Sequence, residues 1–239
     1  MPTMNVSVNE NEVPVQAHDL APDTLEQVIE SPKFVAWLDS IAPKLTLSSI
    51  HIQSVDMFGA SVGFVKMRVV VIRSGGKSQD VIVVLRGGTS VIFPVLVCEG
   101  KLYTAAVKQM RVPVGNDSYW EIPAGMIDGE SYESTAIREL EEETSIKLDF
   151  SAAIELSQTG PMFVTPGLLD EKMMFYSVEA HVKPDELSAL QGLTTGVEHE
   201  NESLVVEVIR MDEVPSKLGH DMKSMMAYLL YVSKLSSSA

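Results

Sequence analysis

The sequence predicts an α/β fold, and three observations support this prediction. Apolar runs alternate with glycine-containing turns from residue 45 to about residue 103, a pattern typical of antiparallel strands. A helical pattern of charged and apolar residues follows at residues 132–144. After it, strands are expected near residues 153–156, 172–182 and 204–210, and a helix over about residues 217–232. With 239 residues, the chain is long enough to bury the core of one α/β domain with an appendage.

The chain is expected to consist of three segments. Residues 1–22 are polar and acidic and contain several prolines, so we expect a flexible arm there. Between residues 23 and 41, apolar residues recur at helical spacing and Ser31-Pro32 interrupts them, which predicts two short helices. With the strands that follow, they form an expected N-terminal region over residues 23–88, and residues 89–239 form the expected main domain. The apolar residues of the C-terminal helix are expected to face the core: Met222, Met225, Met226, Leu229 and Leu230.

Composition excludes several classes of function. The formal net charge of −15 argues against binding of a nucleic-acid backbone as the main activity. The longest apolar runs are too short to span a bilayer, so no membrane partner is expected. The N-terminal residues show no targeting pattern, which predicts a cytoplasmic location. The single cysteine, Cys98, lies in an apolar run and is expected to be a buried, reduced thiol.

The most informative segment is an acidic helix. Glu139, Glu142 and Glu143 stand at i, i+3 and i+4, so their carboxylates crowd one helix face. Like charges at this spacing destabilise a helix by about 0.2–0.5 kcal/mol per pair. A hard divalent cation such as Mg²⁺ or Mn²⁺ would remove this repulsion and suits oxygen ligands. The alternative is an acidic helix face that water solvates.

The residues around this helix favour the metal site. Residues 121–125, E-I-P-A-G, lead from an apolar segment into a glycine-containing loop just before the helix. Glu130 stands at the helix start, and small residues at 134–136 allow close packing on a sheet. The segment therefore predicts a strand, a loop and a helix built around a metal ion.

This segment resembles the Nudix box, G-x5-E-x7-R-E-U-x-E-E-x-G-U, in which U is a bulky aliphatic residue. The positions in register are Glu130, Arg138, Glu139, Leu140, Glu142, Glu143 and Ile146. The loop from Gly125 to Glu130 is one residue short, and Ser145 replaces a glycine whose left-handed backbone costs other residues about 1 kcal/mol. The resemblance implies the Nudix fold, in which a mixed β-sheet lies between helices.

The resemblance extends beyond the box. Residues 107–113, V-K-Q-M-R-V-P, are similar to the V-x-Q-x-R-x-P segment of Nudix enzymes that cleave ADP-ribose and nucleotide sugars. Thr165-Pro166-Gly167 is similar to their S-P-G marker, and residues 45–66 resemble plant ADP-sugar diphosphatases. The resemblance implies hydrolysis of a nucleotide-sugar diphosphate, and a homodimer formed through the N-terminal β-region.

The resemblance also implies roles for individual residues. Expected metal ligands are the side chains of Glu139, Glu142 and Glu143 and the carbonyl of Ala124. Arg138 is expected to orient these carboxylates and to pair with Glu130. The expected substrate-binding residues are Gln109, Arg111 and Gly125.

The catalytic base is expected on a late loop. Residues 196–203, G-V-E-H-E-N-E-S, are similar to the G-x-x-D-E-N-E segment of ADP-ribose hydrolases. Glu200 matches their base and Glu202 its neighbour, while Glu142 in the box is the competing candidate. An ordinary acidic surface loop is the alternative.

Three functions stay open on the sequence. The first is a metal-dependent diphosphatase of ADP-sugars or UDP-sugars, and the second is an ADP-ribose hydrolase that yields AMP and ribose 5-phosphate. The third is a catalytically inactive, nucleotide-sensing Nudix module. The intact glutamates at 139, 142 and 143 argue against the third function.

Overall fold

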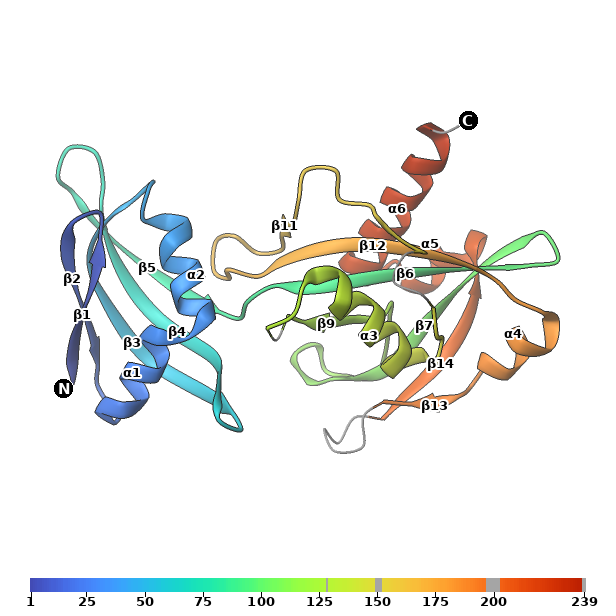
Figure 1. The fold of residues 1–239 in the computed structure, drawn as a ribbon, viewed down its shortest axis with the longest axis horizontal. Helices are drawn as coiled ribbons and strands as arrows, with labels where there is room; N and C mark the ends of the chain where they lie inside the picture. Colours follow the sequence, from blue (N-terminus) through green and yellow to red (C-terminus); the bar gives the residue numbers. More distant parts are fainter. Residues whose placement is uncertain (128, 149–151, 197–202, 238–239) are drawn as a thin grey trace. The chain divides into compact units, whose positions relative to one another are not determined.

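The computed structural model describes residues 1–127, 129–148, 152–196 and 203–237, which form two compact units (Figure 1). The first unit comprises Met1–Gly87 and Phe163–Lys172. The second comprises Gly88–Met162 and Met173–Ala239. Within the described residues, no helix is both long and apolar enough to cross a membrane.

The first unit is built on a five-stranded sheet with the order β1-β2-β3-β4-β5. Neighbouring strands are antiparallel except β2 and β3, which run parallel. The strands are β1 (Thr3–Val8), β2 (Asn11–Ala17), β3 (Thr46–Phe58), β4 (Ser61–Ile72) and β5 (Ser78–Leu85). The antiparallel part of the sheet agrees with the strands predicted from residue 45 onward.

Strands β1 and β2 correct the expectation of a flexible arm over residues 1–22. They form a hairpin whose turn places Asn9 and Glu10 in the left-handed backbone region. Val13 and Val15 are fully or nearly buried in the core of the unit. A half-buried hairpin needs an apolar residue only at every second position, so its average composition resembles that of a disordered segment.

The two predicted helices of this unit are present. They are α1 (Pro22–Glu30) and α2 (Pro32–Ile41), and each begins with a proline in its first turn. The Ser31 hydroxyl between them accepts a hydrogen bond from the Phe34 N–H at 3.4 Å and caps α2. The helices bury Leu25, Val28, Phe34 and Trp37 against the strands.

The segment Phe163–Lys172 belongs to the first unit through its contacts with the end of β5. The Val84 N–H donates to the Leu168 carbonyl at 2.9 Å. The Asp170 carboxylate accepts hydrogen bonds from the Arg86 and Gly87 N–H groups at 2.6 and 3.1 Å. Sequence alone placed these residues in the main domain, because contacts across more than 80 positions leave no local pattern.

The second unit contains a mixed sheet with the main order β10-β12-β6-β7-β14-β13. β8 pairs with β7, β9 pairs with β6, and β6 and β12 run parallel. The strands are β6 (Thr89–Cys98), β7 (Lys101–Arg111), β8 (Asn116–Glu121), β9 (Ala124–Met126), β10 (Ala153–Glu155), β11 (Met162–Phe163), β12 (Lys172–His181), β13 (Thr194–Thr195) and β14 (Leu204–Arg210). The strands predicted near 153, 172 and 204 are therefore confirmed.

Helices cover both faces of this sheet. The helices are α3 (Tyr132–Thr144), α4 (Pro184–Leu190), α5 (Val214–Leu218) and α6 (Met222–Ser237). Ile92 of β6 packs with Ala136 and Leu140 of α3. Its neighbour Phe93 packs against Tyr231 of α6, with ring centroids 5.7 Å apart. Because successive strand residues face opposite sides, α3 and α6 lie on opposite faces, and the expected Nudix arrangement is confirmed.

The C-terminal helix corrects one expectation. Met222 and Leu229 are 50% and 54% exposed, so they do not face the core. The buried residues of α6 are Lys223, Ser224, Ala227 and Tyr231. The polar residues Lys223 and Ser224 are buried because they have partners at the end of β8, which the hydropathy pattern does not encode.

Candidate active site

Helix α3 has the boundaries that the sequence predicts. It begins after Ser131, whose hydroxyl accepts a hydrogen bond from the Ser134 N–H at 3.2 Å. It ends at Ser145, which adopts the left-handed conformation with φ of 59° and donates its N–H to the Glu141 carbonyl at 2.8 Å. Ser145 therefore performs the turn of the box glycine at a cost of about 1 kcal/mol.

The acidic residues of α3 are not a simple solvated face. Glu143 lies one turn after Leu140, so it follows the buried side of the helix and is only 4% exposed. Glu139 and Glu142 are half-buried. Glu141 is exposed and pairs with Lys147 at 2.8 Å. Burial of a carboxylate is costly unless it is paired or binds a cation, so the alternative of a solvated face does not account for Glu143.

Strand β9 gives Glu139 its position. Gly125 lies opposite Ser90 on β6, and a Cβ atom added to it would stand 1.7 Å from Glu139 Oε1. Gly125 is not among the residues with positive φ, so glycine is required here for space rather than for backbone freedom. The Glu139 carboxylate thus lies directly on the β9 backbone, beside the residue that follows Ala124.

Arg138 supplies the positive charge next to these carboxylates. Its Nη1 atom lies 3.0 Å from Glu139 Oε1 and 2.7 Å from Glu142 Oε2. Its Nε atom donates to Glu130 Oε2 at 3.3 Å. Burial alone would lower the pKa of Arg138, but the three glutamates outweigh burial and raise the pKa above its ordinary value. The structure therefore links the first glutamate of the box to two expected metal ligands.

The donor atoms of this region fit a hard divalent cation. Among the described residues, no three side chains of histidine, cysteine or acidic type already converge as a finished metal site would require. However, the Glu139 carboxylate contacts Gly125, and Glu143 is buried on the same helix. Both glutamates offer oxygen ligands. With the Ala124 carbonyl, this set has the chemistry that Mg²⁺ and Mn²⁺ prefer.

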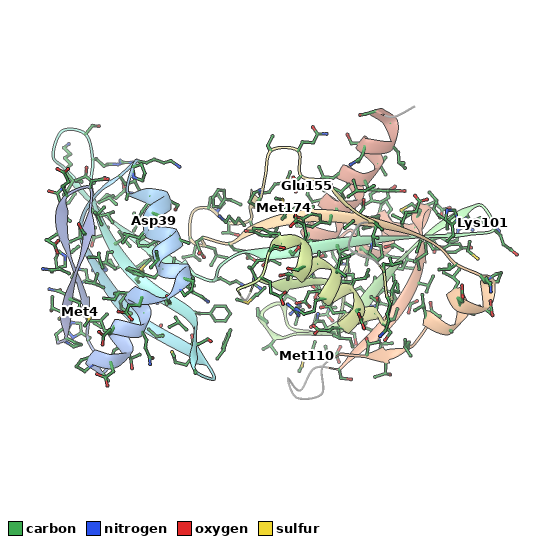
Figure 2. The ribbon with its side chains drawn as sticks, viewed as in Figure 1. Met4, Asp39, Lys101, Met110, Glu155 and Met174 are labelled. Carbon is green, nitrogen blue, oxygen red and sulfur yellow. The ribbon has the colours of Figure 1, made fainter. Side chains whose placement is uncertain are left out.

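A second cluster surrounds Glu121 at the end of β8. The Gln109 side chain donates to Glu121 Oε1 at 2.6 Å, and Arg111 binds the same oxygen. Lys223 Nζ lies 2.6 Å from Glu121 Oε2. Met110, labelled in Figure 2, separates the two β7 residues and is exposed. The structure thus brings the two expected substrate-binding side chains, Gln109 and Arg111, together on one carboxylate.

The charge on Glu121 is stabilised by its neighbours. Glu121 is only 4% exposed, and this burial raises the pKa of its carboxyl. Lys223 and Arg111 outweigh the burial and hold the pKa below its ordinary value. Arg111 keeps 41% of its side chain exposed, so solvent and a ligand can reach the guanidinium group.

The Glu121 cluster lies on the same face of the sheet as α3. Val206 belongs to the apolar cluster beneath α3, and it stands opposite Val107 on β7. Val107 in turn stands opposite Glu121 on β8. Residues directly opposite in neighbouring strands share a face, so Glu121 belongs to the face that carries α3, and Lys223 reaches its carboxylate from the first turn of α6.

The late loop starts at the end of α3. The Thr195 hydroxyl donates to the Glu143 carbonyl, and the Gly196 N–H donates to the Glu142 carbonyl at 3.3 Å. Thr195 pairs with Leu204, the first residue of β14, so both ends of the loop are held together. The expected base Glu200 and its neighbour Glu202 lie outside the described residues.

Sequence reasoning missed Lys223 and its support. The Asp221 carboxylate accepts a hydrogen bond from the Ser224 N–H at 3.0 Å, which caps the start of α6. The Ser224 hydroxyl accepts from the Ile122 N–H at 3.0 Å. The spacing of Asp221 and Ser224 could have indicated the helix start, but no local signal indicates that Lys223 reaches Glu121.

The chain is similar in sequence and in fold to several known proteins. A family model described as the NUDIX domain matches residues 70–229. The chain is 32% identical over 220 residues to "Nudix hydrolase 14, chloroplastic" of Arabidopsis thaliana, covering 85% of this chain and 71% of the relative. It is 39% identical over 82 residues to "Putative nudix hydrolase 2" of Caenorhabditis elegans, covering 34% of either protein. A solved structure described as "Crystal structure of ADP compounds hydrolase" shares the fold, with a TM-score of 0.54, 17% identity and coverage of 82% of this chain and 96% of that chain.

Proposed function

Because the chain belongs to the Nudix hydrolase family and is an enzyme of that family, we propose that it hydrolyses the diphosphate bond of nucleoside diphosphate sugars. The products would be a nucleoside monophosphate and a sugar 1-phosphate. The observation that carries this proposal is the contact of the Glu139 carboxylate with Gly125, the residue that follows Ala124. Arg138 forms an ion pair with the same carboxylate. The contact between Glu139 and Gly125 supports the proposal, because it sets one expected ligand of α3 against the strand that carries the Ala124 carbonyl.

The reaction requires that negative charge on the diphosphate be neutralised. When bound, Mg²⁺ or Mn²⁺ would polarise the phosphate oxygens and lower the pKa of a water molecule. In this proposal Glu139, Glu142 and Glu143 hold the cation together with the Ala124 carbonyl. Arg138 and Glu130 keep the carboxylates oriented through the ion pairs described above.

The substrate is held from the side of β7. Arg111 is the proposed phosphate ligand, because its guanidinium group is accessible and Glu121 fixes one of its ends. Gln109 lies on the same carboxylate and is the proposed second polar contact. Gly125 is the third proposed substrate contact, through its backbone, and the space beside its Cα atom is occupied by the Glu139 carboxylate.

The proposed catalytic base is Glu200, with Glu202 as its neighbour and Glu142 as the competing candidate. The hydrogen bond from the Gly196 N–H to the Glu142 carbonyl supports the proposal, because it fixes the start of the loop beside the expected metal ligands.

A panel of substrates tests the proposed reaction. Turnover of ADP-glucose, UDP-glucose, GDP-mannose and ADP-ribose would be measured with Mg²⁺ and with Mn²⁺. We expect ADP-glucose to give AMP and glucose 1-phosphate with the highest kcat/KM. A higher value for ADP-ribose would favour the second function, an ADP-ribose hydrolase, which the fold shared with an ADP compounds hydrolase also brings into consideration. Binding of nucleotides without any turnover would favour the inactive sensing module.

We also propose a homodimer formed through the first unit. On β4 and β5, Val71 and Val83 pack against the core, whereas Val70 and Ile82 belong to the other face of the sheet and are still half-buried. These apolar side chains alternate on that face with Lys66, Arg68 and Asp80, and together they form the surface proposed to pair with a second copy of the chain. Light scattering at micromolar concentration should give twice the mass of 26.1 kDa, and a monomer there would contradict this proposal.

A further inference from the structure

We propose that Lys223 of α6 is a positioning residue, which holds Glu121 and, through it, places Gln109 and Arg111 for the substrate diphosphate. This inference rests on the proposed function, since it gives the two β7 side chains their purpose. Lys223 itself would not touch the substrate. Its role would be to fix the carboxylate on which the phosphate-binding side chains rest.

The ion pair between Lys223 and Glu121 is buried. Lys223 and Glu121 are 8% and 4% exposed, and their charged atoms lie 2.6 Å apart. A buried ion pair loses much of its attraction to desolvation, and apolar residues of the same size are often at least as stabilising. Stability alone is therefore a weak reason for burying these two charges at the end of β8.

The two oxygen atoms of the Glu121 carboxylate have different partners. Oε2 faces Lys223, whereas Oε1 accepts the hydrogen bonds of Gln109 and Arg111. With one oxygen held by Lys223, the carboxylate cannot rotate without losing an ion pair. The other oxygen therefore offers Gln109 and Arg111 a fixed acceptor, and the exposed part of the guanidinium group has a defined orientation.

Lys223 is itself held in place by its neighbours in the first turn of α6. Ser224 accepts the N–H of Ile122, the residue next to Glu121, so the first turn of α6 is fixed to the same strand end. Asp221 caps this turn and lies 3.9 Å from Lys223 Nζ. The positive charges of Arg111 and Lys223 balance the negative charges of Glu121 and Asp221, so the cluster carries no net charge.

The kinetic test uses three variants in the full-length protein. Lys223→Met keeps the length of the side chain and removes the charge, Lys223→Arg keeps the charge, and Lys234→Met removes an exposed lysine from the same helix. For Lys223→Met we expect KM for ADP-glucose to rise by about tenfold or more, while kcat changes by less than about threefold. Lys223→Arg should recover most of this loss, and Lys234→Met should match the wild type. Unchanged KM in folded Lys223→Met would overturn the proposal.

A second measurement does not depend on activity. In protein with ¹⁵N-labelled arginine, the Arg111 Nε–H signal would be assigned by its loss in Arg111→Lys. We expect Lys223→Met to shift this signal and Lys234→Met to leave it unchanged. If the wild type hydrolyses no nucleotide, the proposed function fails, and the Arg111 signal still shows whether Lys223 positions Arg111. An unshifted signal would overturn the positioning role.

A paired variant covers the case in which Lys223→Met does not fold. Glu121→Gln/Lys223→Met removes both charges of the ion pair, so neither of the two is left buried without the other. It should fold, shift the Arg111 signal and raise KM as Lys223→Met does. Wild-type KM together with an unshifted Arg111 signal in this variant would show that the ion pair is only structural.

Discussion

Gly125 and Glu139 are in contact across the turn between β9 and α3, and the carboxylate of Glu139 occupies the space that a side chain at position 125 would need. An added Cβ atom would stand 1.7 Å from Oε1 and 2.0 Å from Cδ of Glu139. No real contact is this short, so any other residue at position 125 must move the glutamate. Glycine is thus required at position 125 of the box because no side chain fits beside the Glu139 carboxylate.

The first prediction is that Gly125→Ala displaces Glu139 and lowers kcat/KM by about 10² or more, because misplacement of a reacting group by about 1 Å has this effect. The fold should persist, because the backbone at position 125 does not need positive φ. Gly167→Ala is the matched control, since a Cβ there meets nothing within 4 Å. Steady-state kinetics and thermal unfolding check both variants. Wild-type kinetics in Gly125→Ala would exclude Glu139 from the reaction.

The second prediction concerns Glu143. Glu143→Gln should abolish Mg²⁺-dependent turnover and leave the fold intact. Without metal, its stability should hold or rise, because each pair of like charges at helical spacing costs about 0.2–0.5 kcal/mol. Thermal unfolding with and without Mg²⁺ checks this. Glu141→Gln on the exposed side of α3 should keep full activity, and unfolding or normal turnover of Glu143→Gln would make Glu143 structural.

The third prediction concerns the base. Glu200→Gln should lower kcat by about 10²–10⁴ with little change in KM, because a general base acts in the transition state rather than in substrate binding. Glu202→Gln should have a smaller effect. The rates are compared with that of Glu142→Gln at saturating Mg²⁺. A nearly normal kcat for Glu200→Gln would return the role of base to Glu142 in the helix.

The fourth prediction is a pH dependence of stability that originates at Glu121. Its pKa is lowered in the folded protein, so its ionisation stabilises the fold above the unfolded pKa of about 4.3, and this contribution disappears as the pH falls through the folded pKa. Wild type should therefore exceed Glu121→Gln in stability at pH 7, and the difference should shrink below about pH 4.3. Urea unfolding from about pH 3 to about pH 8 measures this difference.

The control for the pH series is Glu99→Gln, which removes one negative charge from an exposed turn. The chain carries a formal charge of −15, so losing any single negative charge relieves some general repulsion. A Glu121→Gln curve that parallels the Glu99→Gln curve at every pH would show that the buried ion pairs contribute nothing specific.

What the sequence could predict depends on how local the determining contacts are. Helix α3 was predicted to its last residue, because its charged and apolar residues repeat within one turn and Ser131 and Ser145 mark its ends. The contact between Gly125 and Glu139 could be expected, because the two residues are only 14 positions apart in one motif. Lys223 was missed because its partner Glu121 lies 102 positions earlier and neither residue carries a local sign of the pairing. The β1–β2 hairpin was missed for a different reason, since alternating burial is invisible to average composition.

The late loop and the last turn of α3 share their anchoring points. Thr195 and Gly196 bind the carbonyl groups of Glu143 and Glu142, the same residues whose side chains are proposed to hold the cation. Each of these glutamates therefore has two proposed roles: its side chain binds the metal, and its carbonyl group holds the start of the loop. An engineer who exchanges this loop for that of a relative, to change the substrate, would have to transfer the end of α3 with it as one piece.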